Sequence, residues 1–545
     1  MKRDLLEEMR NGAKLTTRDQ IKLIFSLSLP AILAQISFVF MEYIDAAMVG
    51  QLGANPSASI GLVAPLTWVF FGIMSASVTG FSVQVAQWIG ANDGKKARNT
   101  FKLGAIVTFT LSFIFCAIGL GIASHVPVWL GGEEAIRGDA TSYFGIFMGA
   151  LPIFLATTFM SGMLRCSGNI RTPSFIHIGI CVLDVFFNSL LIFESHDFSL
   201  FGLDIHIPCA GLGVSGAAMG TVLAELCGGI ALLCAIMRKK CVLRPVRGEN
   251  LTWEPAIVLQ AAKISIPIAF EHIVLSGALV VTTAIIAPLG AISLAANSLA
   301  VSAESICYMP GFGIAEAATT LVGQSIGAKR FDLTKRLSWM CIAFGIATMG
   351  VMGALMYAAA PIMFAILTPV GAIQVLGIRV LRIEAFAEPL YGAALVCTGS
   401  LRGAGDTLVP SLLNLTSMWG VRITLSYLLV DSMGLVGIWT AMAIELSCRG
   451  CLLLVRVYRK DWSKSLIAES APSESASAES APAESAPSES APAESAPAKS
   501  APAESAPVES APVESASAES ASAESAPAES APAESAPAKS APVEA

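Results

Sequence analysis

The chain has 545 residues, of which 54% are hydrophobic and only 14% are charged, and its mean hydropathy is +0.67. Soluble domains are about one quarter charged, so this composition excludes a soluble enzyme and indicates a polytopic membrane protein. Of the formal net charge of −7, the 14 Glu and 2 Lys after residue 468 contribute −12, which leaves +5 for the rest of the chain. A positive body suits a membrane protein whose basic loops face anionic lipid.

The first 22 residues are charged and contain no cleavage site after a short apolar region. We therefore expect residues 1–22 to be a cytoplasmic lead-in and not a cleaved signal peptide. Twelve apolar runs of spanning length follow, and each predicts a transmembrane helix, because lipid cannot satisfy the backbone polar groups of an open structure. The predicted spans are 23–48, 59–85, 102–125, 142–164, 173–194, 213–237, 264–287, 294–322, 337–361, 376–400, 410–430 and 435–457. The fold class is an all-α polytopic membrane protein.

Lysine and arginine are concentrated in alternate connections between these spans. The lead-in, the stretches 95–102 and 238–247 and the exit after residue 455 are basic, whereas the stretches 49–58 and 288–293 contain no Lys or Arg. Because basic loops stay on the cytoplasmic side, we expect both termini to be cytoplasmic, in a prokaryotic cytoplasmic (inner) membrane.

The two halves of the chain form an internal repeat. A shift of 237 residues superimposes Gln87 on Gln324, Pro152 on Pro389 and Arg165 on Arg402. Each half has six predicted spans, an even number, so the halves enter the membrane from the same side and form a parallel repeat. We predict an N-terminal six-helix lobe (23–240), a cytoplasmic linker (241–262) and a C-terminal six-helix lobe (263–460). The register breaks at residues 194–209, which we expect to be an extra outer loop.

Residues 461–545 form a tail dominated by a five-residue Ala/Glu/Ser/Pro repeat. Frequent proline and regularly spaced glutamate prevent a packed core, so we predict a disordered and dispensable tail. The alternative is a docking segment.

Ionisable side chains inside spans are costly and are candidates for function. Asp45 lies fifteen residues after Pro30, a predicted hinge, and Glu42 lies one turn before Asp45 on nearly the same face. The two acids could share a proton or hold a cation, or they could simply be solvated near the outer interface. Asp184 and Asn188 are four residues apart and share a face. They suit a proton relay or a hard cation such as sodium, with a structural hydrogen-bonded pair as the alternative.

The second half lacks an acid at the position that matches Asp45, which is Thr282. We therefore expect coupling to reside in the N-terminal lobe. Glu304, Glu388 and Glu271 are the candidate substrate-binding acids of the second lobe, and Glu388 precedes Pro389, a second predicted hinge. Glu384 is interpreted as an internal ion pair with Arg382 or Arg379. The basic side chains of Arg165 and Arg402 are explained by helix capping or by lipid headgroups.

Several other classes find no support in the sequence. There is no phosphate-binding loop of an ATP-driven pump, no metal-ligand cluster and no nucleophile–base set. We therefore expect no enzyme activity, no cofactor beyond a coupling ion and no nucleic-acid partner. The expected partners are a small organic substrate and membrane lipid, and the expected state is a monomer.

The motifs resemble those of the multidrug and toxic-compound extrusion (MATE) family. They are Leu29-Pro30, Asp45-Ala-Ala-Met-Val-Gly50-Gln-Leu-Gly53, Leu164-Arg-Cys-Ser-Gly168-Asn-Ile-Arg-Thr-Pro173 and Leu401-Arg-Gly-Ala-Gly405-Asp406-Thr-Leu-Val-Pro410. The resemblance covers roughly residues 20–460. It implies two lobes that alternate between outward-open and inward-open states, driven by proton or sodium entry, with cationic or amphipathic organic substrates.

The resemblance also bears on single residues. Asp45 resembles the family's coupling acid, and Thr221 resembles a position that completes a polar cluster with Asp184 and Asn188. The family commonly has the Asn before the Asp, so the reversed order here puts the ion and its geometry in doubt. A lipid-linked-oligosaccharide flippase of the same superfamily is the alternative. Membrane-embedded acids outnumber bases here, which favours cationic cargo.

Overall fold

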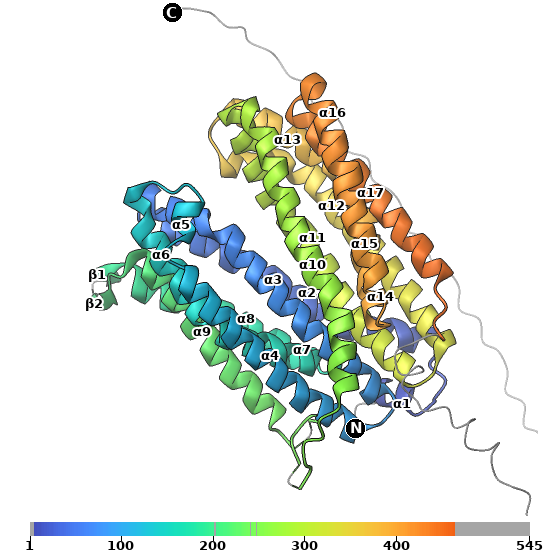
Figure 1. Cartoon of the computed structure of the whole chain (residues 1–545). Coiled ribbons are helices and arrows are strands. Elements are labelled where there is room, and N and C mark those ends of the chain that lie inside the picture. Colours follow the sequence, from blue (N-terminus) through green and yellow to red (C-terminus); the bar gives the residue numbers. More distant parts are fainter. Residues whose placement is uncertain (1–4, 201–202, 240, 247, 464–545) are drawn as a thin grey trace, which may run out of the picture. The chain divides into compact units, whose positions relative to one another are not determined.

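The computed structural model describes residues 5–200, 203–239, 241–246 and 248–463 (Figure 1). Within them the chain is almost entirely helical, as predicted, with a single two-stranded sheet. The repetitive tail beyond residue 463 lies outside the described residues, so its disorder stays a prediction.

The N-terminal half begins with a short helix and continues with long ones. A capping box opens the first long helix, because the Thr16 hydroxyl accepts from the Asp19 backbone N–H at 3.2 Å and the Asp19 carboxylate accepts from the Thr16 N–H. The helices are α1 (Leu5–Arg10), α2 (Thr17–Gly50), α3 (Ala54–Gly90), α4 (Gly94–Ile122), α5 (Val126–Trp129), α6 (Glu134–Gly149), α7 (Leu151–Cys166), α8 (Arg171–Ile192) and α9 (Gly213–Ile236). The predicted outer loop at 194–209 is an antiparallel hairpin of β1 (Glu194–Leu200) and β2 (Leu203–Ala210).

The C-terminal half repeats the order of long helices. Its elements are α10 (Pro255–Ile286), η1 (Ala287–Leu289), α11 (Ala291–Gly327), α12 (Phe331–Leu367), α13 (Gly371–Glu384), α14 (Glu388–Gly403), α15 (Leu408–Ser417), the π-helical η2 (Met418–Ile423), α16 (Thr424–Met433) and α17 (Leu435–Arg459). Pro30 and Pro267, at matching repeat positions, lie inside α2 and α10.

All twelve predicted spans coincide with helical segments, but three of them are not single α-helices. The span 142–164 is divided between α6 and α7, which are bent by 46°. The span 376–400 breaks between α13 and α14, and the span 410–430 contains the π turn. Pro152 and Pro389 cause the first two breaks, because each opens a new helix where its missing N–H costs nothing. Among the described residues, eight helices qualify singly as membrane spans, or nine with the bent pair.

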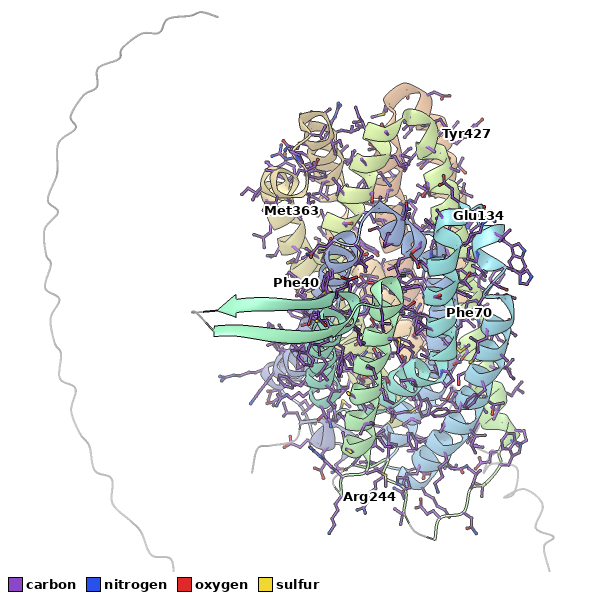
Figure 2. All side chains as sticks on the ribbon, turned by 90° about the vertical axis from the view of Figure 1, so that its left-hand side faces the viewer. Phe40, Phe70, Glu134, Arg244, Met363 and Tyr427 are labelled. Carbon is purple, nitrogen blue, oxygen red and sulfur yellow. The ribbon has the colours of Figure 1, made fainter. Side chains whose placement is uncertain are left out.

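Labelled residues mark the two opposite ends of the helical body. Arg244, in the basic connection between α9 and α10, lies at one end, and Glu134 and Tyr427 lie at the opposite end (Figure 2). We call these the linker end and the far end. At the linker end Arg98 Nη2 pairs with Glu249 Oε1 at 2.6 Å, and this hydrogen bond lowers the pKa of the Glu249 carboxyl. The contact ties the connection to the start of α4.

The first long helix of each half crosses to the other half. Thus α2 packs against α8 of its own half and α11 of the other, and α10 packs against α15 of its own half and α3 of the other. The largest hydrophobic cluster accordingly mixes α1 and α2 with α11, α12, α14 and α17. Any motion of one half relative to the other must therefore be accommodated along α2 and α10.

Candidate functional site

Three of the predicted coupling residues form one cluster in the N-terminal half. Packing of α2 against α8 brings Asp45 to the face that carries Asp184 and Asn188. The Asn188 amide Nδ2 donates to Asp45 Oδ1 at 2.9 Å and to Asp184 Oδ2 at 3.0 Å. Asp184 and Asn188 are fully buried, and Asp45 is partly buried. A single amide group thus bridges two carboxylates on different helices.

The acid cluster retains unused hydrogen-bonding capacity. Asp184 Oδ1 and Asn188 Oδ1 are buried and accept no hydrogen bond within the described part of the chain. Buried polar atoms usually have partners, so these oxygens mark a place where a proton or cation could be held. Glu42 is exposed one turn before Asp45 and lies outside the hydrogen-bonded set. The Thr221 hydroxyl on α9 donates to the Ala217 carbonyl of its own helix at 3.2 Å.

Two further residues shape this cluster, and sequence reasoning did not identify them. Gly220 lies so close to Asn188 that a Cβ on it would be 2.0 Å from Asn188 Oδ1. Only glycine leaves room for this placement. Glu225, on α9 one turn after Thr221, interacts electrostatically with Asp184. Glu225 could have been found, because every acid inside a predicted span is a candidate. Gly220 could not, because glycine has no functional group that marks it in the sequence.

The C-terminal half has a separate group of buried acids. Glu384 and Glu388 are completely buried, Glu304 is 7% exposed, and Glu388 and Glu384 interact electrostatically with Glu304. Both carboxylate oxygens of Glu384 and of Glu388 lack hydrogen-bond partners within the described residues. The nearby base is Arg422 in the π turn, which interacts with Glu304, Glu384 and Glu445. The predicted pairing of Glu384 with Arg382 is wrong, because Arg382 donates to the Tyr357 carbonyl and covers the Tyr357 ring instead.

Glu271 contacts a different set of residues and is fully partnered. It accepts from the Ser411 hydroxyl at 2.5 Å and from Asn414 Nδ2 at 2.7 Å, and Arg402 Nη2 lies 3.6 Å away. The carboxylate therefore joins α10 to α14 and α15. Arg402 meets a buried acid here, so neither helix capping nor lipid is required to explain it.

At the linker end the two halves meet through matching residues of the repeat. Gln87 Nε2 on α3 donates to the Gly403 carbonyl at 3.2 Å, and Gln324 Nε2 on α11 donates to the Cys166 carbonyl at 2.8 Å. The 237-residue shift relates both the donors and the acceptors. Gly90 and Gly327 allow the close approach, because a Cβ on either would collide with the backbone of the other half. We call these two hydrogen bonds the reciprocal Gln contacts.

A charged contact between the two halves accompanies them. Arg165 on α7 pairs with Glu316 on α11, and Gln35 Nε2 on α2 also donates to Glu316 at 3.4 Å. The Arg165 side chain, which the sequence explained by capping or lipid, thus bridges the two halves. Further along α2, the Tyr43 hydroxyl donates to the Ser302 carbonyl of α11.

No group of three or more His, Cys, Asp or Glu side chains in the described part of the chain is arranged to hold a metal ion. A sodium ion at Asp45, Asp184 and Asn188 would use two carboxylates and the free amide oxygen, a donor set that suits a hard cation. This site stays a prediction.

Comparison with known proteins agrees with this architecture. The MatE family model matches residues 30–190 and 267–428, one segment in each half. The chain is 26% identical over 446 residues to the uncharacterized transporter YisQ of Bacillus subtilis, covering 81% of this chain and 94% of that protein. It is 25% identical over 452 residues to the multidrug resistance protein NorM of Burkholderia vietnamiensis, with coverage of 81% and 94%.

Solved structures share the fold at low sequence identity. A mutant of the Vibrio cholerae MATE transporter VcmN has a TM-score of 0.75 at 16% identity, covering 82% of this chain and 99% of that one. A MOP superfamily transporter from Pyrococcus furiosus also has a TM-score of 0.75, at 17% identity, with coverage of 84% and 98%. Because the two segments that match the MatE model together cover more than half of its residues, the chain belongs to the MATE family of integral membrane transporters.

Proposed function

We propose that the protein is a cation-coupled antiporter that exports organic cations or amphipathic compounds by alternating access. The observation that carries this proposal is the bridging of Asp45 and Asp184 by Asn188. Two carboxylates on one amide repel each other, and a shared proton or sodium ion offsets that repulsion. We place the protein in the cytoplasmic membrane with both termini inside, and propose no cofactor beyond the coupling ion.

Coupling follows from the position of α2 between the two halves. Binding a proton or cation at Asp45 removes a charge where α2 meets α8. The same helix meets α11 through Gln35 and Tyr43. A change at the cluster therefore alters a helix that also contacts the opposite half, and the two arrangements of α2 are the states that the ion selects between. Pro30 lies inside this helix and removes one of its hydrogen bonds, so it serves as the hinge.

The cargo is proposed to bind against the acids of the C-terminal half. Glu304 and Glu388 are buried and Glu388 has no hydrogen-bond partner in the described residues, so an organic cation that reaches them gains from pairing in a low-dielectric site. Glu271 already has three partners and contributes to cargo binding only if they move. The same excess of acids disfavours the flippase alternative, since a pyrophosphate headgroup requires a cationic cavity.

The test is transport by Asp45→Asn protein in reconstituted vesicles under separate pH and sodium gradients. Asparagine keeps the shape of the side chain and fixes it in a neutral form, so gradient-driven uptake of a cationic dye should fall to background while dye binding persists. Asp139→Asn is the matched control, because Asp139 is an exposed acid on α6 of the same half. Wild-type coupling in Asp45→Asn would remove this residue from the mechanism. The gradient that drives the wild type identifies the ion.

A further inference from the structure

The short helix α1 lies at the linker end and contacts both halves of the transporter (Figure 1). Leu5, Leu6 and Met9 on α1 are at most 9% exposed, and they belong to the hydrophobic cluster that mixes the two halves. A cytoplasmic lead-in with charged residues was the expectation from the sequence. The structure instead buries one face of this segment between the helices that must move.

On the side of the C-terminal half, α1 is held by a well-defined polar contact. Arg330, in the turn between α11 and α12, donates through Nη1 to the Met9 carbonyl at 3.2 Å and to the Ala13 carbonyl at 2.6 Å. These carbonyls belong to the end of α1 and the connection that follows it. An arginine there satisfies carbonyl groups that the short helix leaves free and complements its dipole.

On the side of the N-terminal half, α1 has a close apolar contact and a longer hydrogen bond. Leu6 packs against Gly168, where a Cβ would lie 2.6 Å from Leu6 Cδ1, and Asn92 Nδ2 donates to Asn11 Oδ1 at 3.4 Å. A pocket of about 230 Å³, partly open to solvent, lies beside this hydrogen bond and is lined by Asn11, Asn92 and Val242. The hydrogen bond to Asn11 is longer than the two that Arg330 donates, so separating α1 from the N-terminal half costs less than separating it from the C-terminal half.

The residues that α1 touches adjoin the reciprocal Gln contacts. Gly168 lies two residues after Cys166, which accepts from Gln324, and Arg330 lies three residues after Gly327. We propose that α1 is a latch across the linker end. It holds the two halves together there, and it stays with the C-terminal half and leaves the N-terminal half when this end opens. This inference rests on the alternating access of the proposed function. It adds that α1 sets the fraction of molecules whose linker end is open.

Single-molecule energy transfer in proteoliposomes measures that fraction directly. Fluorophores are placed on the full chain at positions 95 and 335 through genetically encoded clickable residues, because Lys95 and Lys335 are exposed on α4 and α12 and the native cysteines then stay untouched. The double variant Leu6→Ala/Met9→Ala removes the buried face of α1, and Arg330→Ala removes its polar anchor. Each should raise the population with separated linker ends by about threefold or more relative to wild type.

Two controls separate the latch from general loss of stability. Leu232→Ala removes a fully buried leucine from a hydrophobic cluster whose members all belong to the N-terminal half, and Lys14→Ala changes an exposed side chain beside α1. Neither should shift the distribution. An unchanged distribution in both α1 variants, or an equal shift in Leu232→Ala, overturns the latch. Transport by wild-type protein in the same vesicles is scored separately, so a failure of the antiporter proposal is distinguishable from a failure of the latch.

Discussion

The acid clusters of the two halves occupy related folds but differ in chemistry. In the N-terminal half, one amide bridges two carboxylates, and Asp45 is partly exposed. In the C-terminal half, the carboxylates of Glu384 and Glu388 are completely buried without hydrogen bonds, and a base lies among the acids. The two halves of the repeat therefore share a scaffold but differ in their buried groups: the partly exposed Asp45 beside Asp184 fits the proposed ion exchange, and the buried glutamates fit the proposed recognition of a cation.

The register of the repeat identifies the residues that differ between the two acid clusters. The position that matches Asp45 is Thr282, whose hydroxyl donates to the Ala278 carbonyl at 2.9 Å within its own helix. The position that matches Asp184 is Val421, next to Arg422 in the π turn Met418–Ile423. The neighbouring Arg422 interacts electrostatically with Glu304, Glu384 and Glu445. The second half thus has a base in the turn that follows the register of Asp184, where the first half has an acid.

Gly220→Ala should break the N-terminal cluster without touching an ionisable group. The added Cβ would lie 2.0 Å from Asn188 Oδ1, so the amide must move and the bridge between Asp45 and Asp184 opens. We expect gradient-driven transport to fall by about tenfold or more, since small misplacements of paired groups are costly. Uptake in vesicles measures this. Gly179→Ala on α8 is the control, because a Cβ there meets nothing within 4 Å. Wild-type rates in Gly220→Ala would show that Asn188 need not bridge the acids.

Glu304→Gln and Glu388→Gln should test the proposed role of the acids in the C-terminal half. Each removes a buried charge at constant size, so export of cationic substrates should weaken by about fivefold while export of neutral amphipathic substrates changes less. Competition between a cationic and a neutral dye measures the ratio. Asp431→Asn is the control, because Asp431 is an exposed acid on α16 of the same half. Equal losses for both substrate types would indicate altered packing instead of altered recognition.

Much of the comparison between the two acid clusters could be predicted from the sequence. Each of the twelve predicted spans coincides with helical segments, and the i, i+4 spacing predicts the shared face of Asp184 and Asn188, which meets Asp45. The sequence predicts the hinge at Pro389, where α13 ends and α14 begins, but hydropathy did not reveal the break at Pro152, because it averages over a whole run. The sequence predicts an outer loop at 194–209, where the structure has a hairpin of two strands.

Contacts that end on backbone carbonyls could not be predicted. Gln87 and Gln324 were visible as matching residues of the repeat, but their acceptors are main-chain oxygens of Gly403 and Cys166, which no side-chain pattern encodes. The partner of Arg165 was missed for a related reason, since Glu316 is distant in sequence and only the packing of α7 beside α11 brings it within reach.

Glu271→Gln should affect stability more than transport. The Glu271 carboxylate is 4% exposed and holds α15 through Ser411 and Asn414, so its role resembles a structural tie and contrasts with the unpartnered Glu388. Loss of the charge weakens these hydrogen bonds by about 1–3 kcal/mol in total, and the midpoint of thermal unfolding in detergent should fall. Transport measured well below that midpoint should stay within about threefold of wild type. A selective loss of cationic transport at unchanged stability would instead add Glu271 to the cargo site.

Truncation after Ser465 should have the smallest effect. The matched family segments end at residue 428, and all contacts between the halves described above lie between residues 5 and 463. The Ala/Glu/Ser/Pro repeat has no counterpart in the first half and cannot bury a core, so we expect no step of transport to depend on it.

We expect transport rates of the truncated protein within about twofold of the full chain at equal insertion. Vesicle uptake normalised to inserted protein measures this, and a truncation after Leu453, which removes the end of α17 with its buried Val457, serves as the control that should fail. Loss of transport by correctly inserted protein lacking only the tail would mean that the tail docks on the helical body. Transport would then depend on the tail as well as on the two halves.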